Sequence, residues 1–186
     1  MNAVPATTSE RIAIRSMRGE DLPQVLEIDR QSFSMPWPAS AYEYELHENP
    51  ASMLWVAEAL EPQASPCVVG MIVVWFIVDE AHIATIAVHP NRRGGGIAKQ
   101  LLATAMEKII SRDFSIATLE VRASNMAAQN LYRLFGYQIV GQRPRYYRDN
   151  QEDALIMTIQ GLDHAYLDWL EKRAWERSSG EKNDPR

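Results

Sequence analysis

Three consecutive glycines, at residues 94–96, stand between a β-rich segment and a segment whose apolar residues have helical spacing. Ordered glycines are costly because each loses more backbone freedom on folding than any other residue. A strand, bare backbone and a helix N-terminus in succession bring unsatisfied N–H groups and the positive end of the helix dipole to one place. The pattern favours a phosphate ligand, and its alternative is a plain turn. The run matches neither the P-loop pattern Gly-x-x-x-x-Gly-Lys-Ser/Thr nor the dinucleotide-binding pattern Gly-x-Gly-x-x-Gly. The sequence therefore disfavours both of these kinds of nucleotide site.

Composition narrows the function classes. The chain has 186 residues, 46% of them hydrophobic and 23% charged, which is typical of one globular domain. A net charge of −5 disfavours direct nucleic-acid binding. The single Cys67 allows no internal disulfide and is expected to serve in packing, and the four histidines have no metal-site spacing. The longest apolar run, residues 67–78, is too short for a membrane span, and the N-terminus has no leader-like apolar region, so we expect a cytoplasmic protein without a membrane association.

Periodicity predicts alternating strands and helices. Strands are expected at residues 11–15, 52–60, 67–78, 80–90, 114–123, 137–142 and 153–160, and helices at 19–33, 40–49, 96–112, 124–136 and 162–177. Ser40 is the expected cap of the second helix, and Gly136 the expected end of the fourth. A polar loop is expected at residues 143–152 and a disordered tail at 178–186. The predicted class is α/β, with a mixed and mostly antiparallel sheet flanked by helices.

Four segments then resemble one family. Arg93, Gly96 and Ala98 fit the pattern Gln/Arg-x-x-Gly-x-Gly/Ala of the acetyl-coenzyme A loop in the GNAT N-acetyltransferase superfamily. The segments MPWPASAYEYEL, LEVRASNMAAQNLYRLFGY and YYRDNQEDALIM resemble those of its RimI-type branch, the ribosomal-protein-alanine N-acetyltransferases. The resemblance implies a GNAT domain over residues 11–160, and the C-terminal helix that periodicity predicts at 161–177 lies outside it. The chain departs from the pattern where glycines replace basic residues before Gly96, and where Ala39 and Ser40 replace an acidic residue.

The resemblance implies acetyl-CoA as cosubstrate and no metal. The residues that it assigns to the cofactor are Ile86, Ala87 and Val88 for the pantetheine arm, Arg93, Gly94, Gly95, Gly96, Ile97, Ala98 and Lys99 for the pyrophosphate, and Asn125. By sequence alone, Ile86, Ala87 and Val88 are only a core strand. Asn125 is most simply a helix N-cap, a role that can coexist with a cofactor contact.

Acetyl transfer to an amine needs a proton acceptor for the amine and a proton donor for the leaving thiolate. The resemblance assigns these roles to Glu120 and Tyr132. From the residues alone, the simpler interpretation of Glu120 is a solvated carboxylate paired with Arg122, and that of Tyr132 is a core aromatic. A glutamate of ordinary pKa, about 4.3, is a weak base for this task, so we expect either that burial raises its pKa or that it works through water.

The sequence constrains the identity of the acetyl acceptor less than it constrains the fold or the cosubstrate. By resemblance, Trp37 between its two prolines and Tyr146 with Tyr147 contact an acceptor peptide, the N-terminus of a small-subunit ribosomal protein that begins with alanine. An α-amine, with a pKa of about 7.7–8.0, is far more often neutral at pH 7 than a lysine near 10.4. The alternatives are a lysine or small-amine acetyltransferase and a non-catalytic module that binds acetyl-CoA or RNA. The cluster of arginines and tyrosines at residues 143–148 would serve the last of these, or be a solvated hairpin loop.

Overall fold

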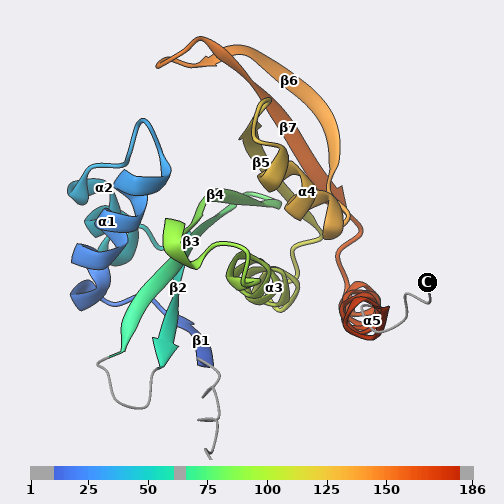
Figure 1. Ribbon diagram of the computed structural model, residues 1–186. Helices are drawn as coiled ribbons and strands as arrows, with labels where there is room; N and C mark the ends of the chain where they lie inside the picture. The colour runs from blue at the N-terminus through green and yellow to red at the C-terminus, as the bar shows by residue number, and fades with distance from the viewer. Residues whose placement is uncertain (1–10, 61–65, 181–186) are drawn as a thin grey trace, which may run out of the picture. The chain divides into compact units, whose positions relative to one another are not determined.

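A computed structural model describes residues 11–60 and 66–180 (Figure 1). Seven strands form a sheet of order β1-β2-β3-β4-β5-β7-β6. They are β1 (Arg11–Ser16), β2 (Ser52–Leu60), β3 (Cys67–Ile77), β4 (Glu80–Val88), β5 (Ile116–Arg122), β6 (Gln138–Tyr147) and β7 (Glu152–Gln160). The pairs β1 with β2, β5 with β7 and β6 with β7 are antiparallel, whereas β4 and β5 are parallel. The predicted mixed, mostly antiparallel sheet is confirmed.

Between residues 11 and 180, leaving out 61–65, five α-helices accompany the sheet: α1 (Leu22–Ser32), α2 (Ala39–His47), α3 (Ile97–Ile110), α4 (Met126–Leu134) and α5 (His164–Gly180). Short 3-10 turns, η1 (Gly19–Asp21) and η2 (Pro90–Arg92), precede α1 and α3. The apolar stripe expected on α3 is buried along its length at Ile97, Leu101, Leu102, Ala105, Met106, Ile109 and Ile110. Each large side chain buried in this way contributes about 1.5–3 kcal/mol, so the stripe fixes the helix against the core.

The chain divides into two compact units. The first contains residues up to 73 together with residues 85–101, and its interior includes Val25, Ile28, Tyr42 and Met71. The second contains residues 74–84 and those from 102 onward. Met106, Leu119 and Met157 lie in its interior. The glycine run belongs to the first unit, and β5, α4 and the β6–β7 hairpin belong to the second.

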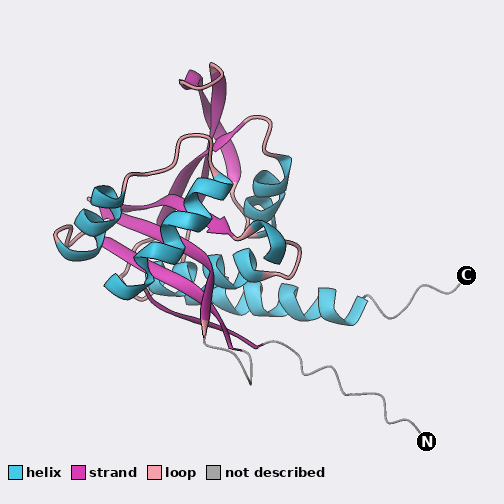
Figure 2. Cartoon of the chain, turned by 60° about the vertical axis from the view of Figure 1, so that its left-hand side comes forward, coloured by secondary structure: helices cyan, strands magenta, loops and turns pink. Residues whose placement is uncertain are grey.

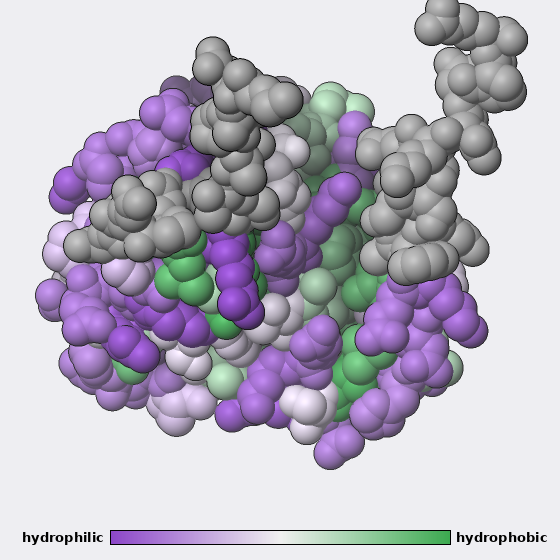
Figure 3. Space-filling view, turned by 60° about the horizontal axis from the view of Figure 1, so that its bottom comes forward, coloured by the Kyte–Doolittle hydropathy of each residue, from purple (hydrophilic) through white to green (hydrophobic). Residues whose placement is uncertain are grey.

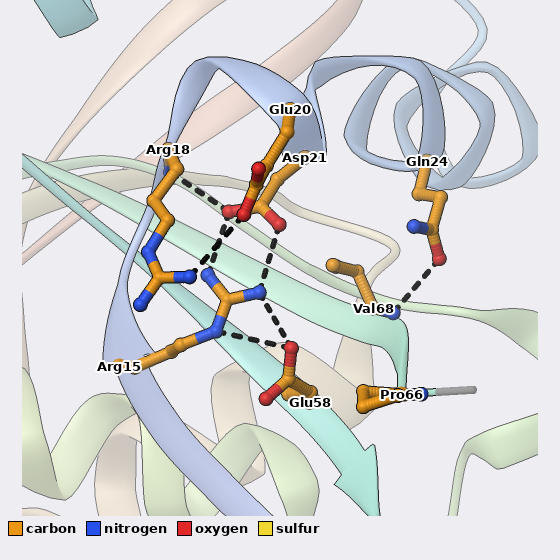
Figure 4. Close-up of a pocket in the computed structure, with 8 residues that line it drawn as sticks. All are labelled: Arg15, Arg18, Glu20, Asp21, Gln24, Glu58, Pro66 and Val68. Carbon is orange, nitrogen blue, oxygen red and sulfur yellow. Dashed lines mark hydrogen bonds and ion pairs between the residues drawn. The ribbon is translucent and has the colours of Figure 1, made fainter. Parts of the chain in front are cut away.

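An ion-pair network joins β1, η1 and β2 in the first unit (Figure 4). Arg15 donates from Nη1 and Nη2 to Asp21 at 2.7 and 2.8 Å, and from Nη2 to Glu58 at 2.6 Å. Asp21 also accepts the backbone N–H of Arg18 at 2.7 Å. Burial opposes ionisation of Asp21, but the Arg15 and Arg18 hydrogen bonds outweigh it, so the pKa of Asp21 is lowered. The network fixes the entry into α1.

Several boundaries differ from expectation, and three of these differences change an interpretation. Helix α2 begins at Ala39 with Pro38 as its N-cap, so Ser40 is not the cap. Strand β6 continues to Tyr147, so residues 143–147 are strand and not loop. Helix α5, drawn as one continuous helix in Figure 2, extends to Gly180 and therefore takes in residues 178–180 of the expected tail. The rest of that tail, residues 181–186, and most of the expected loop at 61–66 lie outside the described residues.

The face shown in Figure 3 is mainly hydrophilic, and hydrophobic residues appear there only in separate patches. Within the described residues, no helix is both long enough and apolar enough to cross a membrane.

Candidate active site

The glycine run forms the predicted junction between β4, η2 and α3. Gly94 and Gly96 have φ of +84° and +80°, values that L side chains rarely adopt. A Cβ at either position would meet nothing within 4 Å, so the backbone conformation and not crowding calls for glycine. Within the described chain, none of the amide N–H groups of residues 94–99 donates a hydrogen bond, and the first to do so is Gln100, to Gly96 O at 3.2 Å. These unpaired amides at a helix N-terminus suit an anion.

Arg93 anchors this loop within the first unit. Its Nε donates to Val88 O at 3.0 Å, and its Nη2 donates to Ser32 Oγ at 3.0 Å. The guanidinium thus ties the loop to the end of β4 and to the last residue of α1. Ala87 and Val88 are buried and Ile86 is half-buried. All three lie beyond the part of β4 that pairs with β5, which covers residues 81 and 82.

Trp37 is held by a residue that sequence reasoning missed. Asp29, 1% exposed, accepts the backbone N–H of Trp37 at 2.7 Å and the hydroxyl of Tyr42 at 2.9 Å. The rings of Trp37 and Tyr42 have centroids 5.3 Å apart. Burial raises the pKa of Asp29, against the effect of its two hydrogen bonds. The signal in the sequence was the position of Asp29 directly after Ile28, on the buried side of α1, because a buried carboxylate needs hydrogen-bond partners.

Glu120 lies in the second unit and contacts one histidine and one arginine. Its Oε2 is 3.0 Å from His82 Nε2, and its Oε1 is 2.9 Å from Arg143 Nη2. The Glu120 side chain is 12% exposed. The hydrogen bond from His82, opposed by burial and helped by the charge of Arg143, lowers the pKa of Glu120. Burial does not raise the pKa of Glu120 overall, so that alternative is wrong, and action through water stays a prediction.

Arg122 is not the partner of Glu120 that the alternative interpretation supposed. It forms ion pairs with Asp149 at 2.8 Å and with Glu152 at 3.2 Å. Its guanidinium carbon also lies 3.8 Å from the ring centroid of Tyr147. The alternation of residues along β5 indicates that Glu120 and Arg122 lie on the face opposite Leu119 and Val121. It does not predict which residues of other strands contact them.

Helix α4 positions Tyr132 and Asn125. Asn125 Oδ1 accepts the backbone N–H of Ala128 at 3.0 Å, which confirms the predicted N-cap. Tyr132 is 5% exposed, and its ring centroid lies 5.7 Å from that of Tyr137. Burial raises the pKa of Tyr132 above its ordinary value, so the phenol stays protonated at neutral pH.

Tyr146 and Tyr147 lie at the end of β6, and their rings pack edge to face with centroids 5.3 Å apart. Tyr146 is 45% exposed, and its ring centroid is 5.5 Å from the guanidinium carbon of Arg143. Tyr147 is half-buried, and burial raises its pKa to about 12. The β6–β7 hairpin (Figure 1) thus carries the two expected acceptor contacts together with an unexpected partner of Glu120, Arg143.

Each of the two units contains some of the candidate site residues. The first holds Trp37, Ile86, Ala87, Val88 and residues 93–99, and the second holds Glu120, Asn125, Tyr132, Tyr146 and Tyr147. Sequence reasoning missed His82 and Asp29, and it placed Arg143 in an RNA-binding or solvated cluster and not beside Glu120. Among the described residues, no group of three or more His, Cys, Asp or Glu is placed to hold a metal ion.

Comparisons with known proteins identify the family. Residues 22–137 match the model of the acetyltransferase (GNAT) family. A Bacillus subtilis protein with the provisional name ribosomal protein bS18-alanine N-acetyltransferase is 40% identical over 149 residues, which cover 80% of this chain and 95% of that protein. The crystal structure of the ribosomal-protein-S18-alanine N-acetyltransferase from Escherichia coli has a TM-score of 0.71 at 26% identity, covering 81% of this chain and 94% of that one. A chain in the structure of the NatC complex bound to Gag peptide and CoA has a TM-score of 0.71 at 25% identity, covering 80% and 98%. The chain therefore belongs to the acetyltransferase (GNAT) family of enzymes.

Proposed function

We propose that this enzyme transfers the acetyl group of acetyl-CoA to the N-terminal α-amine of a ribosomal protein, the terminal alanine of bS18. The observation that carries the proposal is the row of unpaired amides at residues 94–99, in a chain whose relatives are named for this reaction. Because ribosomal proteins are made in the cytoplasm, the reaction belongs to that compartment.

The amides of residues 94–99 would hold the pyrophosphate of the cosubstrate. Two positive-φ glycines and a helix N-terminus fit an anion of this kind. In this account Arg93 keeps the loop in place through Val88 and Ser32, and Lys99 adds positive charge. The backbone of Ile86, Ala87 and Val88, which lies beyond the part of β4 that pairs with β5, would bond the pantetheine amides, and Asn125 would contact the cosubstrate from its N-cap position.

The chemistry follows from the protonation states of the side chains. A neutral amine attacks the thioester carbonyl, the C–S bond breaks, and the departing sulfur takes a proton. Tyr132 is the proposed donor to sulfur, and its raised pKa keeps the phenol protonated until it is needed. The same shift makes it a weak acid, so its hydrogen bond to the developing thiolate contributes more than early proton transfer. Glu120 serves the amine side of the reaction.

Trp37 and the pair Tyr146 and Tyr147 are the proposed acceptor contacts. The ring of Trp37 packs against Tyr42, and the ring of Tyr147 lies against the Arg122 guanidinium, so both aromatic side chains are held in place before a peptide binds. Aromatic side chains held in this way bind at a low cost in conformational entropy.

Acceptor preference tests the proposal. CoA release is measured with three acceptors: a peptide that begins with alanine, the same peptide with its α-amine blocked and an internal lysine left open, and a polyamine. The α-amine peptide is expected to react fastest. Faster release with the blocked peptide or with the polyamine would contradict the proposal and favour a lysine or small-amine acetyltransferase.

A further inference from the structure

His82 has an environment that its place in an apolar strand does not explain. Its Nε2 lies 3.0 Å from Glu120 Oε2, and its ring stacks on Trp75 with centroids 5.6 Å apart and planes 19° from parallel. Its side chain is 20% exposed, so the ring is restrained on two sides yet reaches solvent. A packing role needs neither the carboxylate nor the exposure.

Glu120 is poorly suited to accept a proton by itself. Both of its oxygens are engaged, one by His82 and one by Arg143 at 2.9 Å. Charge-assisted hydrogen bonds to both oxygens favour the ionised carboxylate. Even an unperturbed glutamate has a pKa of about 4.3 against about 7.7–8.0 for an α-amine, a mismatch of more than a thousandfold. The lowered pKa of Glu120 widens that gap.

The imidazole of His82 lacks this handicap. An ionised carboxylate only accepts hydrogen bonds, so the contact requires that Nε2 carry its hydrogen, which leaves the lone pair of Nδ1 in the neutral ring. A neutral imidazole with an available lone pair is the side chain that most often serves as a general base. In the part of the chain that the structure describes, Arg143 and Tyr147, both on β6, are charged or titratable groups that act on the pair.

We propose that His82 is the proton acceptor for the substrate amine, and that Glu120 is the positioning residue that orients its ring. This inference rests on the proposed function. The ammonium N–H bond breaks as Nδ1–H forms, while Nε2–H keeps its bond to Glu120, and the ionised carboxylate stabilises the resulting imidazolium. The amine loses two protons in all: His82 passes the first to solvent, and the second goes to the departing thiolate through Tyr132.

A pH–rate profile separates this arrangement from one in which Glu120 is itself the base. His82→Gln should lower kcat/KM by about 10²–10⁴-fold at pH 7, should leave acetyl-CoA affinity unchanged, and should recover as pH rises toward the amine pKa. Added imidazole should restore activity to His82→Ala but not to Glu120→Ala. His47→Gln, on the exposed surface of α2, is the matched control and should behave as wild type. A His82→Gln enzyme within twofold of wild type, beside an inactive Glu120→Gln enzyme, would overturn the proposal.

Nitrogen-15 spectra of the imidazole groups test the pair without any acceptor. In the wild-type enzyme the neutral ring of His82 should carry its hydrogen on Nε2, and Glu120→Gln should shift the signals of this ring but not those of His47. A ring that carries its hydrogen on Nδ1 would overturn the inference. If the wild-type enzyme acetylates no α-amine, the proposed function fails by the kinetic assay, while the spectra still decide the role of the pair.

Discussion

Replacing Gly96 by alanine probes the backbone conformation on which the cosubstrate site depends. The φ of Gly96 is +80°, and a Cβ there meets nothing within 4 Å, so the substitution adds strain without a clash. Holding an L residue in the left-handed region costs about 1–2 kcal/mol. Gly95→Ala is the matched control: its φ is not in the left-handed region, and its Cβ would meet only Arg92 O at 3.8 Å. It should be neutral or stabilising by about 0.4–1 kcal/mol, because alanine restricts the unfolded chain.

Urea unfolding and titration calorimetry with acetyl-CoA measure the two ways in which the strain can appear. If Gly96→Ala keeps the loop conformation, its unfolding free energy falls by about 1–2 kcal/mol relative to wild type. If the loop relaxes instead, the amides turn away and acetyl-CoA affinity falls by about 5- to 30-fold, the same energy expressed as binding. Gly96→Asn should lose less unfolding free energy or acetyl-CoA affinity than Gly96→Ala, because asparagine tolerates the left-handed region. Equal stability and equal affinity for Gly96→Ala and Gly95→Ala would refute the reasoning.

Three further predictions concern other parts of the chain. Asp21→Asn should lower the unfolding free energy by about 2–3 kcal/mol at pH 7, because it breaks a largely buried ion pair. Folding lowers the pKa of Asp21, so the stabilisation by its ionised carboxylate is present above the unfolded pKa of about 3.9 and is lost as pH falls through the folded pKa. If the urea stability of Asp21→Asn falls with acid in the same way as that of the wild type, this prediction is wrong. Tyr132→Phe should reduce kcat by about 10²–10⁴-fold without recovery at high pH, and stopped-flow rates equal to wild type would show that the hydroxyl is not used. Tyr147→Ala should raise the KM for the peptide more than that for acetyl-CoA, whereas equal changes in the two constants would place this residue outside the acceptor site.

Local periodicity predicted the parts of the fold that depend on neighbours in the chain. The α3 stripe from Ile97 to Ile110 is buried as expected, because a helical period of 3.6 residues places these side chains on one face. The glycine junction and the Asn125 cap were predicted for the same reason: turn and cap preferences are local.

The contacts of Glu120 depend on strand register and could not be predicted in that way. The alternation of residues along β5 indicated on which face of the strand Glu120 lies. Its partners, His82 and Arg143, belong to other strands that are distant in the sequence, so local periodicity could not identify them. Pro144 and the polar residues around it favoured a loop where β6 continues to Tyr147. The strand accommodates them because β6 is an edge strand with an irregular register between Arg143 and Tyr147, where no ladder hydrogen bond from proline is needed.

The proposed reaction is tested most directly by locating the acetyl group after a single incubation. A peptide with an N-terminal alanine and an internal lysine is mixed with the enzyme and deuterated acetyl-CoA, and tandem mass spectrometry locates the label. We predict label on the α-nitrogen of the alanine. Label on the lysine Nζ, or no enzyme-dependent label on the peptide, would contradict it.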